Sequence, residues 1–303
     1  MWGLLRSSFR PAAEIVPLRS YMRQRETLVE ETSTRIMRMQ KALTQMNLML
    51  HHHLVVTDIT GATGLAIISA ILAGQRDPQL LAAHRDYRCH ASQAQIAATL
   101  TGNYRPEHLF ALRQNFEAHQ FLLKQSAECD AAIEALRETL AEKQPQPQAA
   151  PPAARRLRQP NNHAPRFEIR APLHRLTGGA DLSQIHSIGP HAALQLVAEI
   201  GTDMSRWKTA QHFTSWLALA PRHKVSGGRL LSSKTARAAA VLRRCAMSLS
   251  RTSTALGAFY RRLAARIGKL KQLPLPPESS PSWSIACCLA ASSTMTTVPS
   301  VIT

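Results

Sequence analysis

Two long stretches of the chain repeat their apolar residues every three or four positions, as one face of a helix requires. They span residues 20–50 and residues 106–143, and we expect one long helix in each. Such stepping is typical of a coiled-coil seam that joins copies of the chain, and also of an amphipathic helix packed in a bundle or an antiparallel pair. The apolar positions are Ile36, Met39, Leu43, Met46 and Leu50 in the first stretch, and Leu109, Leu112, Phe116, Ile133, Leu136 and Leu140 in the second.

A shorter apolar pattern lies between these two helices. Gly61-Ala62-Thr63-Gly64 precedes an apolar helix that runs to about Leu72, and Gly74 ends that helix. The Gly-x-x-Gly turn is consistent with a tight bend of the backbone and with a contact to nucleic acid.

The second half of the chain has a different pattern. Residues 144–170 are rich in proline and arginine, which predicts a semi-extended linker. Helical spacing returns at residues 192–200, which Gly201 ends, and at residues 236–265. Between them we expect an apolar core made by Trp207, Phe213, Trp216, Leu217 and Leu219. The predicted fold class is therefore mostly α, with a long-helix coiled-coil region joined by a Pro-rich linker to a small helical domain.

A helix-hairpin-helix-like turn opens this small domain. Ser187-Ile188-Gly189 stands before Pro190 and His191, and a Gly-containing turn that opens a helix presents backbone N–H groups able to hold a phosphate. Such hairpins contact the sugar-phosphate backbone without reading sequence. Ser187 occupies the position where a Gly-x-Gly hairpin has its first glycine. The alternative is an ordinary helix-turn-helix packing unit.

A serine flanked by glycines and basic residues follows the aromatic cluster. The segment His223 to Arg229 contains Ser226, which is a candidate nucleophile towards a DNA phosphodiester if a base or metal removes its proton. Residues of the same segment are candidates for binding phosphate oxygens or for close backbone approach, namely Lys224, Gly227, Gly228, Arg229 and, further on, Lys234. By its residues alone, Ser-Gly-Gly is also a common surface turn.

Charge is distributed unevenly along the chain. The net charge is +18, and residues 151–271 hold 21 Lys and Arg against 4 Asp and Glu, whereas residues 1–150 hold 16 against 14. A basic surplus confined to one region predicts a polyanionic partner, DNA or RNA. No apolar run is long enough to insert into a membrane.

The cysteines indicate neither disulfides nor a metal site. Their number, five, is odd and their spacing matches no metal-ligand motif, so we expect no bound metal. The N-terminus has no long apolar segment typical of a signal peptide. These features predict a protein of the reducing cytoplasm.

Several motifs resemble one known family. The pattern W-L-A-L-A-P-R-x-x-x-S-G-G at residues 216–228 is similar to the serine motif of the insertion-sequence-110 family of transposases, in its insertion-sequence-1111 subgroup. Three further stretches resemble the same subgroup, namely D-I-T-G-x-T-G-x-x-I-I-x-A-I-L-x-G-x-R-D-P from Asp58, GNYRPEHLFAL from Gly102 and TALGAFYRRLAARIGK from Thr254. The chain departs from the family after Lys234, where several residues, including an Asn-Arg pair, are absent.

The resemblance implies a DNA recombinase that cuts and rejoins strands, guided by a structured RNA, with Ser226 as its catalytic serine. In the family, Mg²⁺ is bound by an acidic, RuvC-like DEDD domain that has no counterpart here, so we expect no cofactor in this chain and a truncated, inactive transposase. The expected domains are a remnant at 1–19, a helical coiled-coil region at 20–143, the linker at 144–170, a serine transposase domain at 171–271 and a disordered, frameshift-like tail at 272–303.

The implied partners are DNA, a guide RNA and further copies of the chain through the coiled coil. Two other classes of protein remain open. One is a non-catalytic module that binds DNA or RNA through the hairpin and the basic helices. The other is a helical oligomerisation protein.

Overall fold

The structure is a computed structural model that describes residues 9–50, 58–145, 147, 152, 164–165, 167–217, 224–226, 229–232 and 236–267. These residues are mostly helical, which confirms the mostly α fold class. The chain forms two compact units, and unit 1 comprises residues 1–23 together with residues 130–303. Unit 2 comprises residues 24–129. Each long helix contributes to both units, so the division does not coincide with the linker at 144–170.

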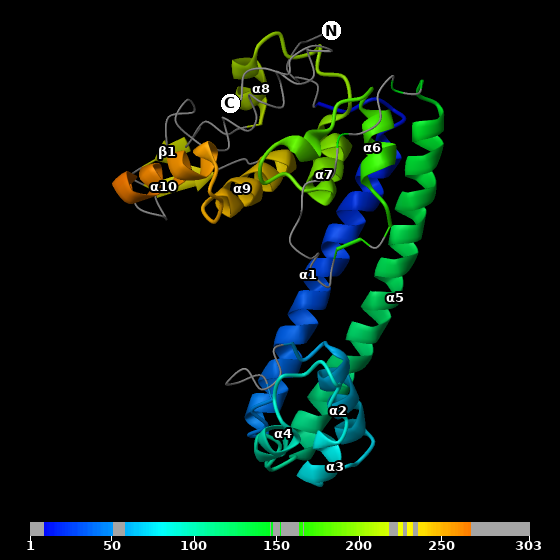
Figure 1. The fold of residues 1–303 in the computed structure, drawn as a ribbon, viewed down its shortest axis with the longest axis vertical. Helices are drawn as coiled ribbons and strands as arrows, with labels where there is room; N and C mark the ends of the chain where they lie inside the picture. The colour runs from blue at the N-terminus through cyan, green and yellow to red at the C-terminus, as the bar shows by residue number, and fades with distance from the viewer. Residues whose placement is uncertain are drawn as a thin grey trace. The chain divides into compact units, whose positions relative to one another are not determined.

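Unit 2 is built on two long helices with three short ones between them (Figure 1). The bounds are α1 Val16–Gln45, α2 Ala62–Leu72, α3 Pro78–Ala82, α4 Gln93–Ala98 and α5 Pro106–Glu142. Helix α5 spans almost the range that its apolar spacing predicts. Within unit 2 the long helices lie side by side, and Arg35 Nη1 of α1 donates to Asn115 Oδ1 of α5 at 3.5 Å.

Helix α1 ends earlier than expected, at Gln45 rather than at residue 50. Asn47 adopts a left-handed backbone conformation with φ 61°, and the N–H of Leu48 bonds to the carbonyl of Leu43 at 2.9 Å. This arrangement is the usual way in which a left-handed residue terminates a helix. Asparagine tolerates that conformation better than most residues, which explains why the helix ends here although the apolar stepping continues.

The predicted coiled-coil seam is buried inside unit 2. Met39, Leu43, Met46 and Leu50 are 0% exposed and pack with apolar residues of α2, α3, α4 and α5 in one core. Ile36 packs against the same core at its edge. These side chains are therefore covered by their own chain, and a helical bundle describes unit 2 rather than a seam that joins copies.

The Gly-x-x-Gly turn is a tight bend. A β carbon on Gly64 would lie 2.2 Å from the carbonyl oxygen of Ile59, so only glycine fits there. Asp58 Oδ1 accepts bonds from the N–H and the hydroxyl of Thr60, and the Thr63 hydroxyl accepts from the N–H of Asp86 at 2.9 Å. The residues of this motif are thus used in fixing the start of α2 and the loop that passes over it.

Unit 1 contains the remaining elements. They are α6 Arg170–Leu176, the 3₁₀ helix η1 Leu182–Gln184, α7 Pro190–Ile200, α8 Ala210–Trp216, the strands β1 Lys224–Ser226 and β2 Arg229–Ser232, α9 Arg237–Leu249 and α10 Ala255–Ile267. Helices α7 and α9 pack against each other, with Leu194 and Leu242 both 0% exposed. Gly201 follows α7 with φ 86°, which confirms its predicted role in ending the helix.

The single helix predicted for residues 236–265 is two helices. The chain leaves α9 after Leu249, and the hydroxyl of Thr254 accepts a bond from the N–H of Gly257 in the first turn of α10. A β carbon on Gly257 would lie 2.4 Å from the Thr252 hydroxyl and 2.7 Å from the Leu249 carbonyl oxygen. The break depends on this close approach and on the hydroxyl residues between the helices, which compete with helical hydrogen bonds.

Residues 9–23 pack against the basic half of the chain. Phe9 lies 4.6 Å from Trp216 and 5.3 Å from Trp207 between ring centroids, in a cluster that also contains the fully buried Phe213. Burial of Phe213 and Leu217 confirms the predicted core, whereas Leu219 lies outside the described residues. The Arg206 guanidinium lies over the Phe9 ring, 5.5 Å from its centroid.

Replacing Leu43 with Asp tests how the seam is used. Because Leu43 is 0% exposed in the core of unit 2, a carboxylate there is expected to cost more than about 4 kcal/mol of unfolding free energy and to unfold the unit. Urea denaturation followed by circular dichroism measures this. Lys41→Asp, at an exposed position of the same helix, is the control and is expected to change stability by about 0.5 kcal/mol or less. A folded monomeric Leu43→Asp variant of an oligomeric parent would instead support the coiled coil.

Candidate nucleic-acid interface

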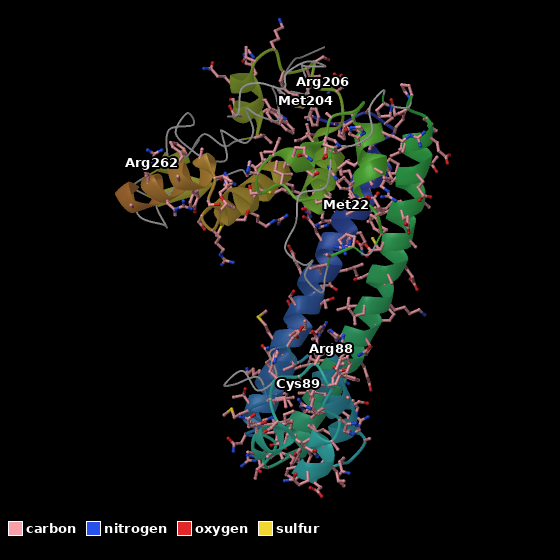
Figure 2. The ribbon with its side chains drawn as sticks, viewed as in Figure 1. Met22, Arg88, Cys89, Met204, Arg206 and Arg262 are labelled. Carbon is pink, nitrogen blue, oxygen red and sulfur yellow. The ribbon has the colours of Figure 1, made fainter. Side chains whose placement is uncertain are left out.

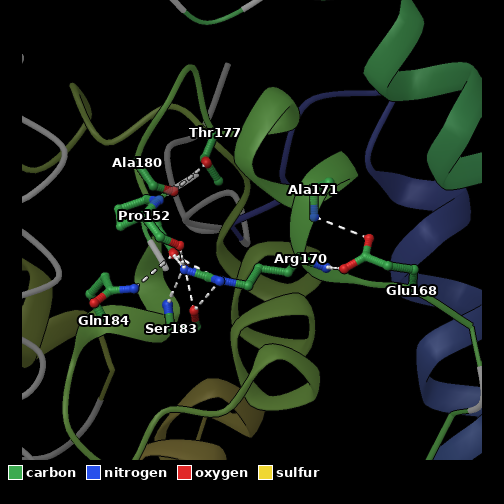
Figure 3. A network of polar contacts seen from close by, with 9 residues as sticks. Pro152, Glu168, Arg170, Ala171, Thr177, Ala180, Ser183 and Gln184 are labelled. Atoms are coloured by element: carbon green, nitrogen blue, oxygen red, sulfur yellow. Dashed lines mark hydrogen bonds and ion pairs between the residues drawn. The ribbon is translucent and has the colours of Figure 1, made fainter. Parts of the chain in front are cut away.

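A polar network fixes the chain just before the hairpin turn (Figure 3). Asp181 caps η1 by accepting from the N–H of Ser183 at 3.0 Å, and its Oδ2 lies 2.5 Å from Arg170 Nη2. Burial by itself would raise the pKa of Asp181, but hydrogen bonds from Ser183, Arg170 and Gln184 outweigh it and lower the pKa. Glu168 accepts from the N–H groups of Arg170 and Ala171 and so caps α6. The carboxylates here stabilise the fold around the hairpin.

The hairpin turn places four of the predicted residues together. Ile188 is 1% exposed and its N–H bonds to the carbonyl of Ile185 at 3.1 Å, so this side chain anchors the turn in the core of unit 1. Ser187 has a left-handed φ of 72°, the conformation for which glycine is best suited, and its buried hydroxyl has no partner among the described residues.

The start of α7 is open to a ligand. Gly189 precedes the helix with φ −80° and ψ 167°, and among the described residues no side-chain hydrogen bond caps the helix. A β carbon on Gly189 would meet no atom within 4 Å, so space lies in front of the turn. Pro190 begins the helix and the half-buried His191 follows it. Uncapped N–H groups at a helix start attract anions, because the helix dipole is positive there.

The predicted serine loop is a short β-hairpin. Strands β1 and β2 pair antiparallel, with Ser226 opposite Arg229 and Lys224 opposite Ser232. Gly227 and Gly228, which connect the two strands, lie outside the described residues, as does Lys234. Ser226, Lys224 and Arg229 thus belong to one hairpin between α8 and α9, whereas Ser187, Ile188, Gly189 and His191 belong to the start of α7.

Helix α9 carries a basic face that the sequence-based candidates did not include. Ala238, Leu242 and Cys245 are buried, whereas Arg237 and Arg244 are exposed on the other side. Arg251, seven positions after Arg244, is also exposed just beyond the helix. Arg237 and Arg244, which are seven positions apart, lie on one face of α9. The signal was present in the sequence as arginines at that spacing.

The arginines of α10 have different roles. Arg261 Nη1 donates to the carbonyls of Ser250 and Thr252, which ties α10 to the break after α9. Arg262, the next residue, is exposed (Figure 2). Sequence alone treats these neighbours alike, whereas the structure assigns one to folding and leaves the other on the surface.

The few acidic residues of this half are already engaged. Glu199 is paired with Arg23, Asp181 with Arg170, and Glu168 caps α6. Asp203 accepts from the N–H of Ser205, and its pKa is lowered mainly by hydrogen bonding to Ser205. No Asp or Glu occurs between Asp203 and Glu278. The exposed arginines of α9 and α10 therefore have no acidic neighbours in sequence to neutralise them.

Within the described ranges, no group of three or more His, Cys, Asp and Glu side chains is arranged to hold a metal ion. Burial raises the pKa of the Cys245 thiol to about 11, which keeps it protonated and unreactive. None of the described helices has the length and apolar character needed to cross a membrane.

Replacing Ser187 with Gly is expected to stabilise the protein by roughly 0.5–1 kcal/mol. The change relieves left-handed strain of about 1–2 kcal/mol, and the greater freedom of glycine in the unfolded chain offsets part of that gain. Thermal and urea denaturation measure the difference. Ser253→Gly is the matched control, because Ser253 is exposed and has no positive φ, and it is expected to destabilise. A loss of stability in Ser187→Gly would contradict the assigned backbone conformation.

Comparisons with known proteins give one match. No curated protein and no solved structure matches the chain. Residues 179–261, which run from just before η1 into α10 and include the hairpin turn, the serine hairpin and α9, match the family described as Transposase IS116/IS110/IS902 family, so this part of the chain is similar to those transposases.

Proposed function

We propose that this chain is a transposase of the insertion-sequence-110 family, in its insertion-sequence-1111 subgroup, and that it binds DNA through unit 1. The observation that carries the proposal is the family match over residues 179–261. The surface of that segment supports it, since exposed arginines of α9 and α10 stand in a stretch without acidic residues. Phosphates along nucleic acid are the polyanion that such a surface attracts.

Two parts of unit 1 contact the sugar-phosphate backbone in this proposal. The uncapped start of α7 receives one phosphate on its N–H groups, with the open space at Gly189 admitting it. Arg237 and Arg244 on the exposed face of α9 neutralise further phosphates, together with Arg251 just beyond the helix. Both contacts are to the backbone and carry no base specificity. We assign sequence choice to a guide RNA, on the strength of the family resemblance alone.

Ser226 is the proposed nucleophile in strand exchange. Its hydroxyl oxygen attacks a DNA phosphorus, so an O–P bond forms and the bond from phosphorus to a deoxyribose oxygen breaks. The proton released by the serine ends on that deoxyribose oxygen, and the reverse reaction with another strand end rejoins the DNA. The pairing of β1 with β2 supports this role, because it sets Ser226 opposite Arg229. Arginine is a cationic residue that is suited to binding a phosphate.

Binding is tested with the full chain and a DNA duplex over a range of salt concentrations. We expect the logarithm of the affinity to fall linearly with the logarithm of the salt concentration. Replacing Arg237, Arg244 and Arg251 together with Gln should reduce that slope by about three, because each arginine that neutralises a phosphate contributes roughly one to it. The control replaces Arg38, Lys41 and Arg105, which are exposed in unit 2, and removes the same charge. Equal effects of the two triple variants, or no duplex binding at low salt, would overturn the proposed interface.

The serine is tested by trapping a covalent DNA adduct. The full chain is incubated with Mg²⁺, guide RNA and donor DNA, together with an acidic metal-binding domain of the family supplied separately, and adducts are separated under denaturing conditions. We expect an adduct that disappears in Ser226→Ala and persists in Ser232→Ala, which replaces a serine of β2 that pairs with Lys224. If Ser226→Ala still forms the adduct, Ser226 is not the nucleophile. If duplex binding occurs without any adduct, the non-catalytic binding module is the better description.

A further inference from the structure

A cavity of about 340 Å³ lies beside the first turns of α1, outside the segment that matches the transposase family. All of its lining residues belong to unit 1. They are Phe9, Arg10, Val16, Arg19, Ser20 and Arg23. Three of the six side chains are therefore arginines.

The carboxylate of Glu199 pairs with two of these arginines. Glu199 of α7 accepts from Arg23 through both oxygens, at 2.6 Å from Nε and 2.7 Å from Nη2. Arg19 Nε is 3.5 Å from the same carboxylate. Because Glu199 carries one negative charge and is already held by a two-pronged contact, the arginines lining the cavity keep a positive surplus.

Arg10 is the arginine of this cavity whose side chain is exposed to solvent. Its side chain is exposed and lines the cavity, and no described residue accepts a hydrogen bond from its guanidinium or forms an ion pair with it. Its backbone is held in place, because its carbonyl accepts from Arg206 Nη1 at 3.4 Å and the neighbouring Phe9 packs edge-on against Trp216 in the aromatic cluster. A cation on a fixed segment beside a cavity is suited to receive an anion.

The environment of Arg19 also favours an anion in the cavity. Burial lowers the pKa of Arg19, and repulsion from Arg23, Arg10 and Arg237 adds to this effect, while Glu199 opposes it. The charged form of Arg19 is thus less favoured than in water despite its carboxylate partner. An anion in the cavity would relieve the repulsion between these arginines.

We propose that the cavity lined by Arg10, Arg19 and Arg23 binds a phosphate group. Guanidinium groups donate several N–H bonds in a planar fork that matches phosphate oxygens. The source of the phosphate is either the backbone of a nucleic acid or free phosphate. In the first case the cavity extends the DNA interface of unit 1 onto α1, and this case rests on the proposed function.

The test uses Arg10→Gln and Arg19→Gln in the full chain, with Arg38→Gln as the control at an exposed position of the same helix. Because the Arg10 side chain is exposed, we expect Arg10→Gln to leave the fold intact. This variant therefore decides the test if Arg19→Gln disturbs folding. One arm measures duplex affinity against salt. The other titrates inorganic phosphate, against chloride of equal ionic strength, and follows the melting temperature.

For a nucleic-acid source we expect Arg10→Gln to weaken duplex binding about tenfold and to lower the salt slope by about one, with Arg38→Gln unchanged. For free phosphate we expect a rise in melting temperature that Arg10→Gln removes. The proposal is overturned if Arg10→Gln alters neither measurement. Duplex binding that is intact and insensitive to Arg10 leaves the proposed function standing. If the parent protein binds no duplex, the proposed function fails and the phosphate titration alone decides on the cavity.

Discussion

The pairing of Glu199 with Arg23 is the contact on which the arrangement of unit 1 depends. The carboxylate is 12% exposed and receives two hydrogen bonds from one guanidinium, a geometry that gives direction as well as attraction. It joins α1 to α7, whose buried face packs on α9. Removing one member would leave the other charge partly buried without its partner, which is costly. Residues 9–23 are thereby an integral part of the unit that contains the family-matched segment.

Aromatic packing reinforces that connection at the other end of the same segment. Phe9 completes a cluster with Trp207, Phe213 and Trp216, and Pro11 lies 3.5 Å from where a β carbon on Gly201 would stand. Buried aromatic rings contribute large apolar areas and favour fixed edge-on or tilted geometries. Together with the ion pair, the cluster holds the first turns of α1 against the basic half of the chain.

The scarcity of acidic residues gives this half its chemical character. Each of its four carboxylates is used for a helix cap, a turn or an ion pair within the chain. The arginines divide similarly, since Arg170 and Arg261 bind carbonyls or carboxylates of the protein while Arg237, Arg251 and Arg262 reach the surface. The negative charges are thus engaged in contacts within the fold, whereas several arginines remain exposed. These exposed arginines are the basis for expecting a phosphate-bearing partner.

Sequence alone determined the helices whose signals are local. The start of α5, the glycine end of α7, the apolar faces of both long helices and the basic surplus all follow from neighbouring residues. It also located the start of α7, which follows Gly189. What required the tertiary structure were features that depend on distant residues. The end of α1 depends on a left-handed Asn47, the bundle on the burial of Leu43 among other helices, and the division of α9 from α10 on the space around Gly257. Two of the arginines that line the cavity beside α1, Arg19 and Arg23, pair with Glu199 far along the chain, and residue spacing carries no record of that long-range pairing.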